Sequence, residues 1–186
     1  LFTEDPGDAY YGKKPVLDEL GQHNLVEWPG KIKGVKNLKK AWKEEEEEEV
    51  SAENLYGYSR YGGYLSQKSQ ATGFFRKEIK DGRWWLVDPD GYHFLSVGVC
   101  CINLSSGGGV KDLDKRMNML KQLPPEKFIQ TNRRGGRTAD YSAWNLERRF
   151  GPDYEKAAID LTIKRMDKWG VNTIGNWSDR RVEKSN

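Results

Sequence analysis

The sequence predicts an α/β protein in which a short antiparallel β-meander leads into the opening of a parallel sheet. Two observations carry this prediction. Tight turns separate three strand-like runs between residues 73 and 99, and a helical pattern over 153–169 continues directly into an apolar run at 171–177. A strand, an excursion, a helix and a second strand make the β-loop-α-β unit from which parallel sheets are built.

The turns predict the meander. Asp81-Gly82 favours a two-residue hairpin, because both central positions of that turn want a positive φ. It joins a strand expected at 74–79 to a return strand expected at 84–87. A second turn follows at 88–91, where proline fixes φ and glycine supplies a positive φ. The third strand is expected at 93–99, and its apolar end is typical of a strand that enters a buried sheet.

The helix over 153–169 is predicted from the spacing of its apolar residues, which recur at intervals of three, four, seven and eight and form one broad face. These residues are Ala158, Ile159, Leu161, Ile163, Met166 and Trp169. Gly170 is expected to end the helix in the left-handed conformation. A parallel sheet with only two strands cannot bury both faces, so we expect an N-terminal piece of a larger fold or a fold completed by another chain.

The remaining segments are expected to be irregular or solvated. Residues 1–72 form a lead-in with one polar helix near 36–53, which runs into six consecutive glutamates. A glutamate run on a helix points its carboxylates all around the axis, so a solvated face is favoured over a cation site. A short helix is expected over 114–122, and the basic loop 133–137 is expected to be solvated or paired with acids. Residues 73–186 hold the meander and the β-α-β unit.

The composition narrows the function classes. The 186 residues include 31 Lys+Arg and 28 Asp+Glu, and a net charge of +3 gives no reason to expect a nucleic-acid partner. No apolar run approaches the ~20 residues of a membrane span. No signal peptide opens the sequence, so we expect that a leader was never present or precedes this chain. The two cysteines are adjacent and show no zinc spacing, and neither a metal nor a cofactor is expected.

Candidate functional residues follow the parallel strands, because working side chains in βα barrels gather at the C-terminal ends of strands. The first strand ends at Cys100 and Cys101, for which buried thiols are the simplest interpretation. The second is followed by Asn176, Trp177 and Asp179. Trp177 offers a flat apolar face to a sugar ring, and the two polar residues offer hydrogen bonds to hydroxyl groups. An equally weighted alternative is that Trp177 is a packing residue and that Asp179 caps the next helix.

Several segments resemble the β-agarases of glycoside hydrolase family 50 and their relatives. They are residues 71–76, 81–91, 94–99, 144–151 and 169–179, with Trp28-Pro29-Gly30-Lys31-Ile32 upstream. Together they cover most of residues 15–180 in the same order.

The resemblance implies the beginning of a TIM (β/α)8 barrel, preceded by an irregular segment and the meander, and incomplete in this chain. It implies a secreted or periplasmic glycoside hydrolase that cleaves β-linkages in agarose or a related red-algal galactan with retention. The catalytic glutamates are then expected outside this chain, which alone is expected to be inactive. Its partners would be a polysaccharide or oligosaccharide and the remainder of the barrel. The resemblance carries over Asn176, Trp177 and Asp179, with Asn145 in addition, as residues that line the substrate site.

Two other interpretations stay open. A non-catalytic carbohydrate-binding module would use the aromatic side chains of 56–64 and 84–85 as a sugar platform. A structural module would bind no ligand. The residues do not identify a carboxylate pair for glycoside hydrolysis, since Glu147 and Asp153 lie close to an expected loop–helix junction.

Overall fold

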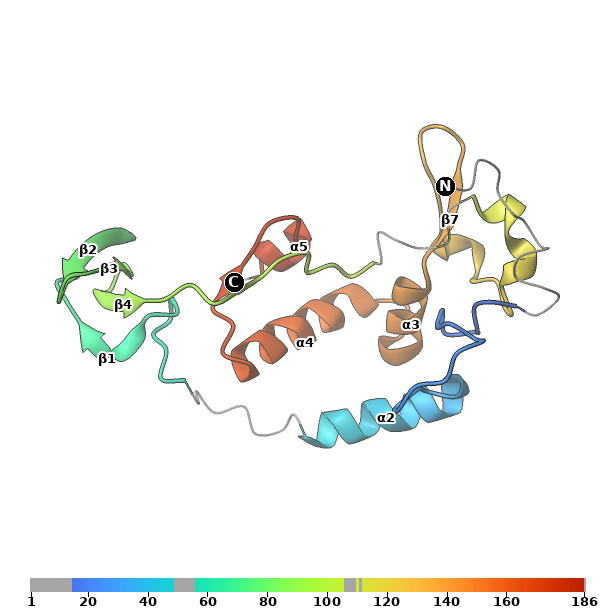
Figure 1. The fold of residues 1–186 in the computed structure, drawn as a ribbon, viewed down its shortest axis with the longest axis horizontal. Coiled ribbons are helices and arrows are strands. Elements are labelled where there is room, and N and C mark those ends of the chain that lie inside the picture. The colour runs from blue at the N-terminus through green and yellow to red at the C-terminus, as the bar shows by residue number, and fades with distance from the viewer. Residues whose placement is uncertain (1–14, 49–55, 106–109, 111, 186) are drawn as a thin grey trace. The chain divides into compact units, whose positions relative to one another are not determined.

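A computed structural model describes residues 15–48, 56–105, 110 and 112–185 (Figure 1). The chain divides into two compact units, each made of two separate stretches. The first unit comprises residues 1–48 and 103–158, and the second comprises residues 49–102 and 159–186. The boundary expected near residue 72 falls inside the second unit, between its first and second strands. In the described part of the chain, no helix has the length and apolarity that crossing a membrane requires.

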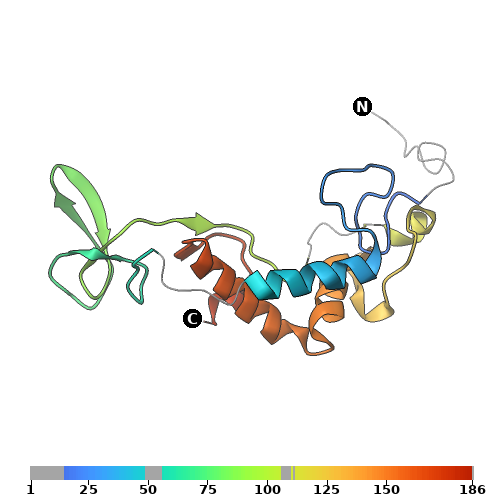
Figure 2. The ribbon, with the colours of Figure 1, turned by 90° about the horizontal axis from the view of Figure 1, so that it is seen from below.

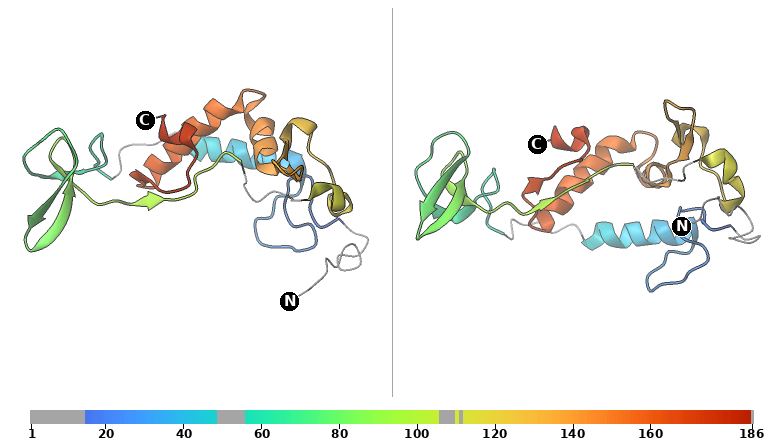
Figure 3. Two further views of the ribbon diagram at one scale, coloured as in Figure 1. Left: turned by 90° about the horizontal axis from the view of Figure 1, so that it is seen from above. Right: turned by 45° about the horizontal axis from the view of Figure 1, so that its top comes forward.

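A four-stranded antiparallel sheet, drawn in green in Figure 3, belongs to the second unit, and its strand order is β1–β4–β3–β2. Its strands are β1 (Tyr64–Lys68), β2 (Arg76–Lys80), β3 (Arg83–Val87) and β4 (Tyr92–Phe94). The expected hairpin is confirmed: Asp81 and Gly82 have φ angles of 52° and 72°, and Lys80 pairs with Arg83 across the turn. β1 was not expected, because its exposed residues show no apolar alternation.

The third strand expected at 93–99 is wrong as a single element. β4 ends at Phe94, and β5 (Gly98–Val99) begins only after three further residues. The side chain of Asn172 explains the interruption: its Nδ2 donates to the Leu95 carbonyl at 2.9 Å, and its Oδ1 accepts from the Val97 amide at 2.9 Å. These side-chain bonds replace strand pairing, so the backbone can leave one sheet and join another.

β5 pairs in parallel with β8 (Thr173–Ile174), with Gly98 opposite Thr173, as the expected β-α-β unit requires. The intervening helix α4 (Tyr154–Lys168) matches the expected range, and Gly170 follows it with a φ of 67°. The expected strand at 171–177 is shortened to two residues. Trp169 is 62% exposed and does not share the buried side of the helix, because it follows the last helical residue.

The core of the first unit lies around the helix α3 (Tyr141–Phe150) and a strand pair, β6 (Ile129–Thr131) with β7 (Arg137–Ala139). Figure 2 shows α3 following this pair in orange. Its buried residues are Leu113, Leu120, Phe128, Ala139, Tyr141, Ala143 and Trp144. α3 was not expected, although Asp140 is a good N-cap and accepts a hydrogen bond from the Ala143 amide at 3.0 Å.

The short helix expected over 114–122 is wrong. That region contains 3-10 turns, η2 (Leu113–Lys115) and η3 (Met117–Met119), and a third, η4 (Glu126–Phe128), follows it. The reason is a competing pairing: the Met119 carbonyl accepts from the amides of Val16 and Leu17 at 2.8 and 2.9 Å. The chain is therefore held extended beside an earlier segment instead of continuing a helix.

The polar helix expected near 36–53 is present as α2 (Gly34–Glu48), and the expected residues after Glu48 lie outside the described range. Glu45 and Glu46 pair with Arg149 of α3 at 2.7 and 3.5 Å, so two members of the glutamate run contact a neighbouring helix. The acid pairing expected for the basic loop 133–137 is confirmed at Arg137, which pairs with Asp114 at 2.8 Å and with Glu126 at 3.0 Å.

Candidate functional site

The C-terminal edge of β5 and β8 is the candidate site. Beyond the paired strands the two segments stay together, because the Cys101 amide donates to the Asn176 carbonyl at 2.9 Å. The Asp179 amide then donates to the Ile102 carbonyl at 2.8 Å. The helix α5 (Arg180–Glu183) follows directly. The loops after both strands are thus fixed to each other by backbone hydrogen bonds rather than left independent.

Ser178 and Gly175 lock this edge further. The Ser178 hydroxyl donates to the Gly175 carbonyl at 2.8 Å and accepts from the Ile102 amide at 3.2 Å. A Cβ atom at Gly175 would lie 2.6 Å from the Cys100 Sγ, so the close approach of the two segments requires glycine there. No sequence pattern predicted these roles of Ser178 and Gly175, since both depend on contact with the other strand.

Two non-glycine residues on this edge have left-handed backbone conformations. Cys101 and Trp177 each have a φ of 60°. Such a conformation costs a residue with a Cβ about 1–2 kcal/mol. Backbone strain of this kind clusters at functional sites, where the surrounding structure holds a side chain in a required position. Here the strain presents Trp177, which is 79% exposed, beyond the end of β8.

The residues expected at this edge divide into two groups. Asn176 and Trp177 are exposed, and the Asn176 amide makes no hydrogen bond among the described residues. Cys100 and Cys101 are also exposed residues, so the expectation that they are buried is wrong. The cause is the shortness of β5: only two of its residues are paired, and the cysteines fall beyond it.

Asp179 belongs to the second group, because local structure already uses it. Its carboxylate accepts from the Arg181 amide at 2.9 Å as the N-cap of α5 and pairs with the Arg181 guanidinium at 2.6 Å. The side-chain hydrogen bond from Arg181 lowers the pKa of Asp179, and the backbone hydrogen bond lowers it further. The structure therefore supports the capping role, with the carboxylate ionised beside the exposed indole.

Asn145 lies on α3 in the first unit, whereas the other three expected residues lie in the second. Its Nδ2 donates to the Leu20 carbonyl at 2.9 Å, and its Oδ1 accepts from Arg148 at 2.8 Å. Arg148 also donates to the Glu19 carbonyl at 2.8 Å. Both side chains thus attach residues 19–20 to α3. The side-chain amide of Asn145 already donates one hydrogen bond and accepts another within the chain.

Comparison with known proteins places this architecture in context. No family model matches the sequence. The chain is 32% identical over 200 residues to β-agarase B of Vibrio sp. (strain JT0107), an alignment that includes 88% of this chain and 20% of that protein. It is 31% identical over 184 residues to β-agarase A of the same strain, covering 88% of this chain and 18% of that protein. The expected resemblance to the β-agarases is confirmed.

Solved structures extend the likeness from sequence to fold. The agarase-like chain superimposes on an agarase, AgWH50C, with a TM-score of 0.80 and 30% identity, covering 92% of this chain and 28% of that one. It superimposes on an exo-β-agarase with a TM-score of 0.80 and 25% identity, covering 97% and 32% of the two chains. The chain spans about a fifth of the length of the curated relatives that it matches.

Proposed function

We propose that this agarase-like chain is part of a glycoside hydrolase that cleaves β-linkages in agarose or a related red-algal galactan with retention. The β5-α4-β8 unit would open a TIM barrel whose remaining strands come from polypeptide outside these 186 residues, in the same chain or another. The single observation that carries the proposal is the exposed Trp177, held in a strained conformation at the strand edge of an agarase-like region.

A retaining mechanism needs two carboxyl groups ~5–5.5 Å apart, one as acid/base and one as nucleophile. The described residues of the candidate edge offer Asp179, which is occupied by Arg181. Glu147 on α3 is ion-paired with Lys127 at 2.5 Å. These pairings support placing the catalytic glutamates elsewhere in the enzyme. We assign this chain a share of substrate binding instead.

Trp177 would stack on a sugar ring, because an exposed indole offers a rigid apolar face of the size of a pyranose. Asn176 would donate to and accept from hydroxyl groups beside that ring. Asp179 would act as a positioning residue, since its cap and its ion pair fix the backbone immediately after Trp177. A secreted or periplasmic location is proposed with this function, because the polymeric substrate lies outside the cell.

Turnover of agarose oligosaccharides tests the proposal. The chain alone is expected to show none, whereas the chain within the longer polypeptide that completes the barrel is expected to hydrolyse them with retention, observable by NMR of the nascent anomer. In the longer protein, Trp177→Ala is expected to raise KM about tenfold, the equivalent of ~1.4 kcal/mol of lost stacking. Hydrolysis by the chain alone would overturn the assignment of catalysis to other segments.

A non-catalytic carbohydrate-binding module is the second candidate function, and one observation favours it. Trp84 is 66% exposed on β3, and Trp85, on the opposite face of the sheet, is not buried, so each face offers one indole rather than a shared platform. By contrast, Tyr58 stacks on Tyr56 and meets Tyr64 edge-on, with ring centroids 5.7 and 5.4 Å apart, so these tyrosines pack on one another. Sugar binding without turnover, even when the barrel is complete, would support this second function.

A further inference from the structure

The two faces of the four-stranded sheet differ in chemistry. Register pairs Glu78 with Trp85 and Lys80 with Arg83. Because side chains alternate along a strand, these four residues share one face. Trp84 lies on the opposite face, as do its strand neighbours of the same parity. Arg76 shares the parity of Glu78 and Lys80, so the first face combines three cations, one carboxylate and an indole, and Arg76 is the cation that binds the carboxylate.

A chain of hydrogen bonds runs across this polar face. His93 is fully buried, and its Nε2 lies 2.9 Å from the Ser69 Oγ. The Ser69 hydroxyl donates to Glu78 at 2.7 Å, and Arg76 donates to the other Glu78 oxygen at 2.6 Å. Since the single hydroxyl proton of Ser69 goes to Glu78, His93 donates to Ser69. These bonds fix the orientation of the imidazole ring.

This order of groups excludes a hydrolytic triad. In a Ser-His-Asp triad the histidine lies between the serine and the carboxylate and takes the serine proton. Here Ser69 lies between His93 and Glu78. The hydrogen bond from Ser69 lowers the pKa of Glu78, and the charge of Arg76 lowers it further, which keeps the carboxylate ionised as an acceptor. The network is built to hold His93 rather than to activate a nucleophile.

His93 in turn supports Trp85. The two ring centroids are 5.3 Å apart and the planes are inclined by 34°. The buried imidazole backs one side of the indole, and it is itself held by one hydrogen bond, from its Nε2 to Ser69, since its Nδ1 has no hydrogen-bond partner among the described residues. A binding group that is ordered before the ligand arrives loses less conformational entropy on binding.

A hollow of about 510 Å³ lies beside this indole. It is lined by Gln67, Lys80, Asp81, Arg83 and Trp85. That volume is within the ~300–1,000 Å³ of small-ligand sites. Neither Lys80 nor Arg83 makes an ion pair among the described residues, and the two cations face a single lining carboxylate. The hollow thus joins an ordered aromatic ring to a surplus of positive charge.

We propose that this hollow binds an anionic saccharide, namely a galactan unit that carries a sulfate half-ester. The sugar ring stacks on Trp85, the sulfate oxygens accept from Arg83 and Lys80, and the Gln67 amide contacts a hydroxyl group. Guanidinium and ammonium groups form strong charge-assisted hydrogen bonds with such oxyanions. This inference goes beyond the proposed function, because it assigns a second binding site and a charge preference to residues outside the β5–β8 edge.

Calorimetric titration of the full chain with two probes of equal length tests the site. One is a carrageenan oligosaccharide, which carries sulfate half-esters, and the other is a neutral agarose oligosaccharide. The sulfated probe is expected to bind at least tenfold more tightly, with an affinity that falls as salt screens the charges. Equal affinity for the two probes would overturn the proposal.

Variants then separate a built site from general surface charge. The double variant K80Q/R83Q is expected to lose about tenfold in affinity for the sulfated probe and to leave the neutral probe unaffected. Both side chains are exposed, so the fold is expected to survive, as circular dichroism would verify. The matched control is Lys77→Gln, which removes a cation that lies over Trp84 on the opposite face, 5.3 Å from its ring centroid. An equal loss in the control would contradict a specific site.

Trp85→Phe provides an independent check, because it keeps a ring above His93 and removes part of the stacking face. Its affinity for the sulfated probe is expected to fall about threefold, and no change would contradict the assigned platform. None of these measurements requires hydrolysis, so a failure of the sulfate site and a failure of the proposed agarose turnover are distinguishable.

Discussion

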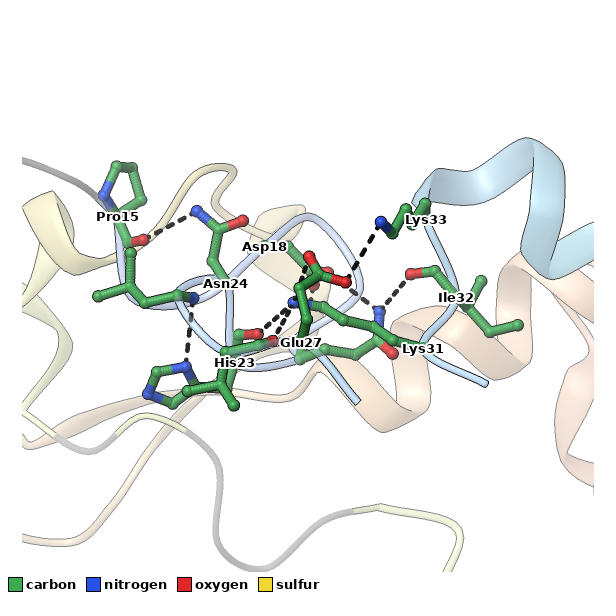
Figure 4. A network of polar contacts seen from close by, with 11 residues as sticks. Pro15, Asp18, His23, Asn24, Glu27, Lys31, Ile32 and Lys33 are labelled. Carbon is green, nitrogen blue, oxygen red and sulfur yellow. Dashed lines mark hydrogen bonds and ion pairs between the residues drawn. The ribbon is translucent and has the colours of Figure 1, made fainter. Parts of the chain in front are cut away.

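Two polar regions of this chain treat their side chains in opposite ways. In the segment 15–33 the polar groups bind the backbone of the segment itself (Figure 4). Asp18 accepts from the amides of Leu20 and Gln22, and Lys31 donates to the carbonyls of His23 and Val26 at 2.8 and 2.7 Å. At the β5–β8 edge, Ser178 and Asp179 also bind the backbone, but the side chains of Asn176 and Trp177 are left exposed.

The difference shows which polar residues indicate function. The segment 15–33 borders a pocket of about 390 Å³, but the charged groups around it already have partners: Lys31 and Lys33 pair with Glu27 at 3.8 and 3.2 Å. Asp179 and Asn145 resemble that segment, because their polar groups already have partners within the chain. Asn176 and Trp177 do not, because their side chains are exposed without such partners among the described residues. Availability to a ligand, and not polarity as such, marks the candidate site.

The largest expected effect comes from removing the Asp18 carboxylate, which accepts hydrogen bonds within the segment 15–33. Asp18 is 8% exposed. Its carboxylate accepts two backbone amides at 2.9 Å and the Gln22 side chain at 3.0 Å. Asp18→Ala leaves those donors without their partner and is expected to lower the free energy of unfolding by about 3 kcal/mol, measured by urea denaturation.

Two controls sharpen this prediction. Asp18→Asn keeps one oxygen for the backbone amides and is expected to cost less than half as much. Glu27→Gln changes a carboxylate that is itself 67% exposed and pairs with Lys31 and Lys33 at 3.8 and 3.2 Å, and it is expected to change stability by less than about 0.5 kcal/mol. If Asp18→Ala were as mild as Glu27→Gln, the hydrogen bonds of this segment would not hold it in solution.

The next effect concerns the close approach of the two strand ends. Gly175→Ala places a Cβ 2.6 Å from the Cys100 Sγ and is expected to cost about 1–3 kcal/mol, because the packed segments must separate. The double variant with Cys100→Ala removes the clashing atom and is expected to regain most of that loss in a double-mutant cycle. Additive losses would show that the sulfur is not the atom in contact.

Features of this structure that depend only on neighbouring residues in the sequence could be predicted, and features that depend on distant residues could not. The hairpin at Asp81-Gly82 and the end of α4 at Gly170 were predictable, because the local backbone alone needs a positive φ there. The parallel pairing of β5 with β8 followed from the order strand, helix, strand. These features require no knowledge of distant residues.

Features set by distant contacts could not be predicted. The break in the expected strand at 93–99 depends on Asn172, 77 residues beyond Leu95. The structural use of Asn145 depends on Leu20, 125 residues earlier, and no local pattern signals it. For Asp179 the local signal existed, since an aspartate before a short helix is a typical N-cap, and both interpretations were open until the partner Arg181 was placed.

A smaller effect is expected at Trp177, where a substitution by glycine should change ligand affinity without lowering the stability of the fold. Trp177→Gly relieves the left-handed conformation, and the exposed ring loses little packing. The free energy of unfolding is therefore expected to stay the same or rise by up to about 1 kcal/mol, while affinity for agarose oligosaccharides falls. Trp169→Ala is the matched control: that indole is also exposed, at 62%, but its removal is expected to leave affinity unchanged. A loss of stability in Trp177→Gly would show that the indole packs in solution.

The smallest effect is the pH dependence contributed by Asp179. Arg181 lowers the pKa of this carboxyl in the folded chain, so the folded state binds its proton less readily than the unfolded state does. The stabilisation is therefore fully present above the ordinary aspartate pKa of about 3.9 and is lost as the pH falls below it through the lowered folded value. Its size is about 0.5–1 kcal/mol, since the cap is short and the ion pair is partly screened.

Urea denaturation between pH 7 and pH 2.5 measures this contribution of Asp179. Asp179→Asn keeps the cap but not the charge, so it is expected to remove this part of the acid dependence. An unchanged acid slope in that variant would mean that Arg181 holds no charge partner at this edge, and Asp179 would then join the side chains available to a ligand.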